Sequence, residues 1–199
     1  PPAEAARAAF PAPIARRTLV PVSFELYPPP TDPGRVSLDR TIDHLASIDP
    51  GFISVTYGAG GTSGGRSLEV LRGIRARTSV EPLAHLTCVG NTYAGATTLI
   101  REFLDAGILS FLALRGDPPE GSVEGDAFLG DLGSAAELVQ LIHRAQAERA
   151  QYAETSLSDV PGAAVVGVPN RARIAVAAFP NGHPRSRGVS QDIDTLLSK

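Results

Sequence analysis

The stretch DAGILSFLALRGDPP (residues 105–119) carries the pattern that decides the fold of this chain. Its centre, residues 108–114 (ILSFLAL), is almost continuously apolar, as expected for a strand buried on both faces of a parallel sheet. Gly107, a candidate helix cap, precedes this run, and the polar Arg115-Gly116-Asp117 follows it before two prolines. The stretch therefore predicts a helix, a buried strand and a functional loop in that order.

The same alternation of short apolar runs and longer amphipathic segments extends outward in both directions. The predicted strands are residues 19–26, 52–56, 82–88, 108–114 and 173–179. The predicted helices are residues 36–48, 67–77, 92–106, 135–150 and 191–199. Such alternation predicts a parallel sheet with right-handed crossovers.

Two architectures fit this alternation, and the (β/α)8 TIM barrel is favoured, with about five of its eight β/α units in the chain. The open doubly wound sheet is the alternative, but the first loop has no GxGxxG to bind a dinucleotide. Residues 1–18, rich in Ala, Pro and Arg, are interpreted as an N-terminal arm, and residues 19–199 as the partial barrel. Residues 152–172 read as an irregular insertion, and the chain is expected to continue beyond Lys199, where a helical pattern stops without a cap.

Composition excludes several classes of protein. The 199 residues, 43% hydrophobic and 20% charged, are typical of one globular domain. The net charge of −3 without a basic block argues against binding to nucleic acid or to an anionic membrane surface. No apolar run approaches the roughly 20 residues that span a bilayer. The single cysteine, Cys88, suits a reducing compartment, so a cytoplasmic location is expected.

Polar residues follow the predicted strands, where the functional loops of a barrel lie. Glu25 stands in the otherwise apolar SFELYPPP, so its carboxyl group is expected to be partly desolvated and to keep its proton, as a general acid requires. The alternatives are a structural ion pair with Arg115 or another base, or simple exposure to solvent. On the residues alone, the catalytic and structural interpretations of Glu25 are evenly balanced.

The other candidates carry weaker signals. Gly116 would let the backbone approach a planar ligand, and Asp117 would place an acceptor over it, although Gly-Asp-Pro-Pro is also ordinary turn chemistry. His85, inside an apolar strand, fits a core residue as well as a ligand contact, and His183 fits a surface loop. Cys88 is expected to be an inert, packed thiol. No spacing of His, Asp or Glu resembles a zinc site.

Five segments, taken together and in order, resemble the methylenetetrahydrofolate reductase family. They are VSFELYPPP (22–30), ISVTYGAGGTS (53–63), PLAHLTCV (82–89), DAGILSFLALRGDPP (105–119) and AVAAFPNGHP (175–184). Each segment is weak alone, but five in collinear order at five strand ends make a specific signal. The resemblance covers roughly residues 20–121 and 171–199.

The resemblance implies a barrel that binds FAD, takes a hydride from NADH or NADPH, and reduces 5,10-methylenetetrahydrofolate to 5-methyltetrahydrofolate. It places the catalytic acid, which protonates folate N10, at Glu25, and an aspartate near flavin and folate at Asp117. Both are implied to contact the substrate. The implied flavin-binding residues are Thr56, Tyr57, Ala59, His85, Leu114, Arg115, Gly116, Asp117, Phe179, His183, Asp192 and Lys199. Arg115 and Lys199 could neutralise the diphosphate.

The sequence also departs from the family pattern. Phe179 stands where many relatives have a tyrosine, and Ser134, Thr195 and Ser198 replace residues that often contact the cofactor. The expected sixth strand, with its Thr-Gln pair, is absent. A flavin-free reductase that uses NAD(P)H directly, and a non-catalytic partial barrel acting as a binding or regulatory subunit, are therefore retained as alternatives. The choice between NADH and NADPH and the formation of a homo-oligomer are left open.

Overall fold

The computed structural model describes residues 20–57, 64–118, 121, 128–158, 171–183 and 186–199. The predicted arm (1–18), most of the glycine-rich loop after the second strand, and residues 159–170 of the predicted insertion lie outside these ranges. The strands are β1 (Phe24–Leu26), β2 (Ile53–Val55), β3 (Pro82–Thr87), β4 (Ser110–Leu114) and β5 (Arg173–Val176). The helices are α1 (Asp32–Ala46), α2 (Gly64–Arg77), α3 (Tyr93–Asp105), α4 (Ala135–Ser158) and α5 (Val189–Leu197).

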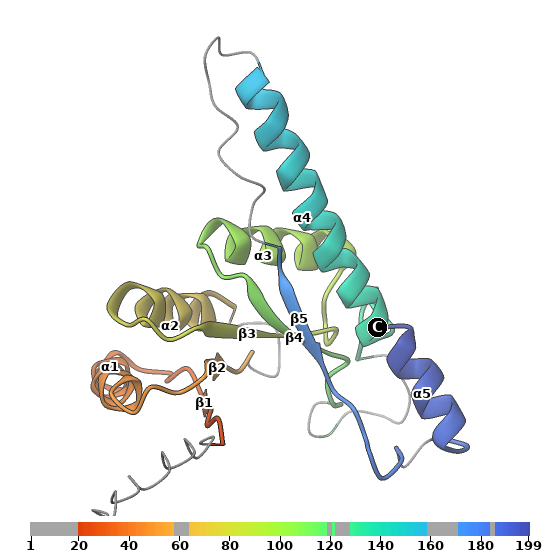
Figure 1. Ribbon diagram of the computed structural model, residues 1–199, viewed down its shortest axis with the longest axis horizontal. Helices are drawn as coiled ribbons and strands as arrows, with labels where there is room; N and C mark the ends of the chain where they lie inside the picture. The colour runs from red at the N-terminus through yellow and green to blue at the C-terminus, as the bar shows by residue number, and fades with distance from the viewer. Residues whose placement is uncertain (1–19, 58–63, 119–120, 122–127, 159–170, 184–185) are drawn as a thin grey trace, which may run out of the picture.

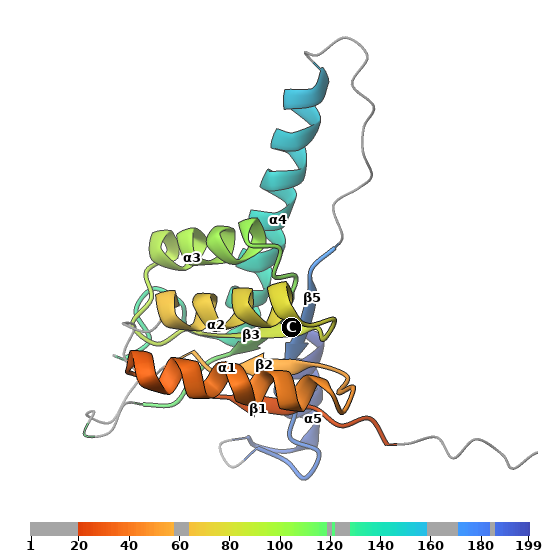
Figure 2. The same ribbon diagram turned by 90° about the vertical axis from the view of Figure 1, so that its left-hand side faces the viewer.

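The five strands form one sheet in chain order, β1-β2-β3-β4-β5, and every neighbouring pair is parallel. This confirms the predicted parallel α/β sheet. Helices α1 to α3 lie side by side along one face of the sheet, with α4 next to α3 (Figures 1 and 2). A doubly wound sheet reverses its strand order at a switch point, whereas strand order here never reverses. The arrangement is therefore that of consecutive β/α units, consistent with a partial barrel.

The register of the sheet separates its residues into two faces. Leu26, Val55, Ala84 and Phe111 are successive register partners and are all buried, so this face packs against the helices. The other face, which we call the open face, carries the neighbouring positions Glu25, Leu83, His85 and Leu112. Successive side chains of a strand point to opposite faces. The core therefore fills the space between sheet and helices, and the open face presents the functional candidates.

Strand β4 is only partly as predicted. Phe111 and Ala113 are fully buried under the helices, with Phe111 in edge-on contact with Phe103 of α3. Leu112 and Leu114 point to the open face and are only partly buried. The expectation of burial on both faces was therefore wrong for the open face, because no second layer of described residues covers it.

Helix boundaries follow local capping chemistry. Helix α1 begins before the predicted residue 36, because the Thr31 hydroxyl accepts the Gly34 amide hydrogen bond and Pro33 occupies the first turn. Gly107 ends α3 as predicted, with a positive φ of 73°. Helix α4 extends to Ser158 rather than ending at residue 150, since no Gly or Pro interrupts residues 150–158. The predicted insertion was wrong over residues 152–158.

Strands β1 and β5 are shorter than predicted. Residues 20–23 are not strand, since Pro21 has no N–H to donate to a ladder, and Val20 and Val22 are exposed. Strand β5 ends at Val176, so Phe179 belongs to the loop that follows.

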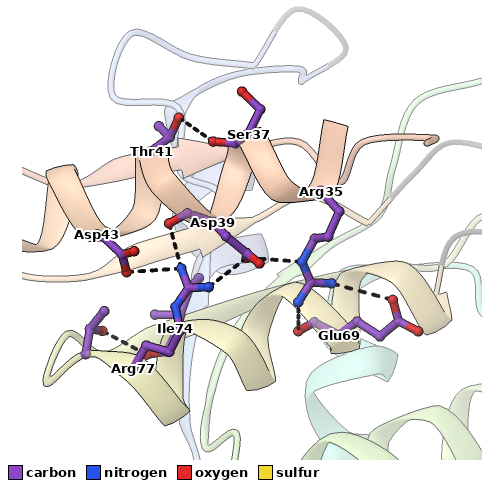
Figure 3. A network of polar contacts seen from close by, with 9 residues as sticks. Arg35, Ser37, Asp39, Thr41, Asp43, Glu69, Ile74 and Arg77 are labelled. Atoms are coloured by element: carbon purple, nitrogen blue, oxygen red, sulfur yellow. Dashed lines mark hydrogen bonds and ion pairs between the residues drawn. The ribbon is translucent and has the colours of Figure 1, made fainter. Parts of the chain in front are cut away.

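A network of ion pairs joins α1 to α2 (Figure 3). Asp39 of α1 accepts from the Arg35 guanidinium at 3.2 Å and from the Arg77 guanidinium of α2 at 3.1 Å. Gly73 makes room for this contact, because a Cβ there would lie 3.2 Å from Arg35 Nη2. The network therefore links the helices that follow β1 and β2.

Candidate functional site

The loop after β4 depends on a glycine. Gly116 has a φ of +86°, and a Cβ at this position would lie 2.5 Å from Val89 Cγ2 and 3.2 Å from Thr87 Cβ. The absent side chain therefore makes room for the end of β3. The backbone amide of Cys88 donates to the Arg115 carbonyl at 3.2 Å, which ties the loop to β3. The Arg115 guanidinium lies 5.2 Å from the centre of the Phe128 ring, in cation–π range.

The loop after β5 is held by α5. Asp192 of α5 accepts the backbone N–H of His183 at 3.1 Å, and the Lys199 ammonium donates to the carbonyl of Ala177 at 3.2 Å. The rings of Phe179 and His183 meet edge to face at 4.6 Å. Helix α5 has no buried residue, so these polar contacts connect it to the end of β5. Figure 1 shows α5 beside the carboxyl end of β5, near the first turn of α4.

These two loops, α5 and the start of α4 line an open pocket of about 760 Å³. Ligand sites in proteins commonly measure about 300–1,000 Å³. The predicted residues that line it are Leu114, Arg115, Gly116, Asp117, Phe179, His183, Asp192 and Lys199. The carboxyl ends of adjacent strands thus bring together residues that are distant in sequence, as predicted for the rim of a barrel.

Glu25 and His85 lie outside this pocket, on the open face of β1 and β3. His85 Nδ1 is 3.7 Å from Glu25 Oε1. The Glu25 side chain is 47% exposed, so the expected desolvation of this carboxyl group is not found. Its position on the edge strand of an uncovered face explains the difference. Among the described contacts, His85 is an ionisable neighbour of Glu25.

His85 is buried, with 9% of its side chain exposed. This burial lowers the pKa of His85, and the negative charge of Glu25 opposes the shift only in part. His85 is therefore neutral near pH 7, with one ring nitrogen available as an acceptor.

Thr56 and Tyr57 follow β2 at the same rim. The Thr56 hydroxyl donates to the Leu26 carbonyl at 3.3 Å, and the Ser67 hydroxyl donates to the Thr56 carbonyl at 2.8 Å. Burial raises the pKa of Tyr57, and a hydrogen bond with Asn91 offsets part of the rise. Ala59, the remaining predicted contact in this loop, lies outside the described residues.

Two residues near the site had no clear sequence signal. Asn91 donates from Nδ2 to the carbonyls of Thr87 and Val89, at 2.9 and 3.3 Å, and shapes the turn after β3. Gln191 accepts the Arg187 amide at 2.9 Å and lines the pocket. The Gly90-Asn91 pair signals a turn, but only the fold shows that this turn supports Tyr57.

Cys88 is fully buried, as expected of a packed thiol. Burial, with a smaller effect of the Glu137 charge, raises the pKa of Cys88 to about 11. Within the described ranges no cluster of three or more His, Cys, Asp or Glu side chains could hold a metal ion. None of the helices described here combines the length and apolar character needed to cross a membrane.

A parallel sheet in chain order with a pocket at its carboxyl edge defines an α/β protein, consistent with part of a barrel. The family model for methylenetetrahydrofolate reductase matches residues 13–199. The chain therefore belongs to the methylenetetrahydrofolate reductase family, as its sequence resemblance predicted.

Curated relatives agree with this assignment. The 5,10-methylenetetrahydrofolate reductase of Salmonella typhimurium is 34% identical over 178 residues, which cover 89% of this chain and 50% of the relative. The Escherichia coli protein of the same name is 33% identical over the same shares. A rice protein named probable methylenetetrahydrofolate reductase (NADH) is 31% identical over 89% of this chain and 28% of its own length. The chain spans about half the length of the bacterial relatives.

Proposed function

We propose that this chain is the amino-terminal part of the catalytic (β/α)8 barrel of a methylenetetrahydrofolate reductase. The reaction would reduce 5,10-methylenetetrahydrofolate to 5-methyltetrahydrofolate with NADH or NADPH, through bound FAD. The observation that carries this proposal is the pocket of about 760 Å³ at the ends of β4 and β5, lined by the residues implied to bind flavin. Family membership and the reductase names of the relatives support it.

The pocket fits a flavin cofactor in size and chemistry. Its lining combines apolar side chains with Arg115 and Lys199, cations that could face a diphosphate. Phe179, half exposed on the pocket wall, offers a ring for stacking in place of the tyrosine of many relatives. A bound FAD would supply the capacity to accept a hydride from the nicotinamide and to return it to the folate.

Glu25 is proposed as the proton donor. Protonation of folate N10 by its carboxyl group would let the bond between N10 and the methylene carbon break, which leaves a reactive iminium at N5. A hydride that originates from the nicotinamide then forms the new C–H bond, and the methylene becomes a methyl group. The resulting Glu25 carboxylate regains a proton from solvent, so one hydride and one proton are consumed in each turnover.

Asp117 lines the pocket beside Arg115, at the loop that Gly116 allows to turn. Its proposed role is to place a negative charge near both flavin and folate. Asp117→Asn is expected to slow folate reduction and to shift the flavin reduction potential, measured by dye equilibration. An unchanged rate and potential would refute this role.

Separated half-reactions test the proposed function. Glu25→Gln is expected to lower folate reduction by at least about 100-fold, the scale of general acid catalysis, while flavin reduction by NADH or NADPH is largely spared. Stopped-flow absorbance measures each step with each nucleotide. Equal loss of both half-reactions would remove Glu25 from the acid role. A purified protein that lacks flavin but oxidises NAD(P)H with methylenetetrahydrofolate would instead support the flavin-free alternative. A protein that catalyses neither flavin reduction nor folate reduction would support the non-catalytic alternative.

A further inference from the structure

Across the open face of the sheet, the two ionisable side chains of β1 and β3 approach each other. Glu25 lies in β1 and His85 in β3, and His85 Nδ1 is 3.7 Å from Glu25 Oε1. Strand β2 lies between them and contributes Ser54, the register partner of Glu25. Because the Ser54 side chain is short, the longer side chains of Glu25 and His85 can meet above it. We propose that His85 is a positioning residue that holds the proton-bearing carboxyl group of Glu25. This inference rests on the proposed role of Glu25 as the acid.

The two partners differ in how firmly the fold holds them. His85 lies in a strand paired on both sides, and its side chain is 9% exposed. Glu25 lies in an edge strand of three residues, and its side chain is 47% exposed. Ordering an exposed glutamate costs side-chain entropy, which a fixed neighbour reduces. His85 is therefore the anchor of the pair, and Glu25 is the group whose position it sets.

The protonation state of His85 determines what the contact can do. Burial lowers the pKa of His85, so near neutral pH the imidazole is uncharged and Nδ1 can accept the O–H of a protonated carboxyl group. A protonated, positively charged His85 would instead stabilise the deprotonated Glu25 carboxylate, which has no proton to donate. Of the strands packed against the pair, β2 presents Ser54 and β4 presents Leu112, and neither of these titrates near neutral pH.

The 3.7 Å separation exceeds the length of a direct hydrogen bond. A small rotation of Glu25, or one bridging water, would complete the contact. Catalytic hydrogen bonds are often longer in ligand-free structures and shorten when substrate binds. The geometry thus points to a role for His85 beside the acid, and the flavin contact implied by the family resemblance is the alternative role to be tested. His85 does not line the pocket formed by the loops after β4 and β5.

Two amide substitutions of His85 separate these roles, because each mimics a different ring nitrogen. In His85→Asn the amide group stands near the position of Nδ1, and in His85→Gln it stands near the position of Nε2. We expect His85→Asn to keep folate reduction within about twofold of wild type, and His85→Gln to lower it about five- to tenfold, the effect of one hydrogen bond. The acid-dependent limb of the pH–rate profile for folate reduction should move to lower pH in His85→Gln only.

Flavin content and flavin reduction by NAD(P)H should be equal to wild type in both variants. Leu83→Val, on the same strand and face, is the matched control and should leave the pH profile unchanged. Loss of flavin in both variants, or equal effects of Asn and Gln on folate reduction, would overturn the assignment. If Glu25 is not the acid, Glu25→Gln should retain full folate reduction. This result does not depend on position 85, so it can be distinguished from failure of the role proposed for His85.

Discussion

Replacing Gly116 with alanine adds one methyl group where the backbone has a φ of +86° and β3 is in contact. The new Cβ would lie 2.5 Å from Val89 Cγ2, whereas ordinary contacts of this kind begin near 3.4 Å. Val89 is 8% exposed, so it has little room to withdraw. The substitution therefore combines backbone strain with overpacking.

Both costs can be put on a common scale. An L-residue in the left-handed region costs roughly 1–2 kcal/mol, and overpacking of a filled site costs about 1–3 kcal/mol. The free energy of unfolding should thus fall by about 2–5 kcal/mol, a large part of the 5–15 kcal/mol typical of a domain. Urea denaturation followed by circular dichroism measures the change, provided that the slope with denaturant stays constant.

Gly90→Ala is the matched control for this prediction. Gly90 also has a positive φ, 65°, but nothing lies within 4 Å of the Cβ that alanine would add. Gly90→Ala should lower the free energy of unfolding by the cost of backbone strain alone, about 1–2 kcal/mol. If Gly116→Ala and Gly90→Ala proved equally destabilising, the close packing of the β4 loop on β3 would not be the reason for a glycine at position 116.

Three further predictions follow from single contacts. Because burial raises the pKa of Cys88 to about 11, the folded protein should resist maleimide at pH 8 and react only after unfolding; rapid labelling of the native protein would contradict this. Burial favours a raised pKa of Glu81, but hydrogen bonds from Ser110 and Arg173 outweigh it, and the pKa lies below its ordinary value of 4.5. The folded state thus gains stability from Glu81 above pH 4.5 and loses this stability as the pH falls further. Arg173→Leu should therefore destabilise the protein at pH 7 and do so less in acid. A difference in unfolding free energy between wild type and variant that stays constant with pH would refute the pairing. Asp39→Asn should lower the free energy of unfolding by about 0.5–1.5 kcal/mol at low salt and by less at 1 M salt, and salt-independent loss would show that the network in Figure 3 acts through packing instead.

The elements that sequence predicted well are those with strong local signals. Strand β4, Ser110–Leu114, lies within the predicted 108–114, and Gly107 marked the end of α3, because apolar runs and left-handed caps depend on nearby residues alone. The same local logic failed for residues 152–158, where polar composition suggested a loop and the absence of Gly and Pro allowed α4 to continue. The length of β1 was overestimated because Pro21 interrupts an otherwise apolar run.

The flavin-binding role that the resemblance assigns to the candidate residues stays a prediction, and their arrangement could not be predicted from the sequence. The resemblance named residues after β4 and β5 that line one pocket, since parallel strands bring their carboxyl ends to one edge. It could not show that Asp192 and Lys199 form hydrogen bonds with the segment that follows β5, or that Glu25 faces His85. Those contacts depend on three-dimensional packing. Burial of Glu25 was also not predictable locally, since it depends on what covers the open face.

Flavin binding by the purified protein is the most direct test of the proposed function. The protein should carry FAD with the visible absorbance of a flavoprotein, and stripped protein should bind added FAD at one molecule per chain. Lys199→Glu should weaken that binding while the β-sheet signal in circular dichroism persists, because it reverses a charge on the pocket wall that could face the diphosphate. Wild-type protein that neither contains nor binds FAD, or a Lys199→Glu variant that binds it equally well, would contradict the assignment of this pocket to the cofactor.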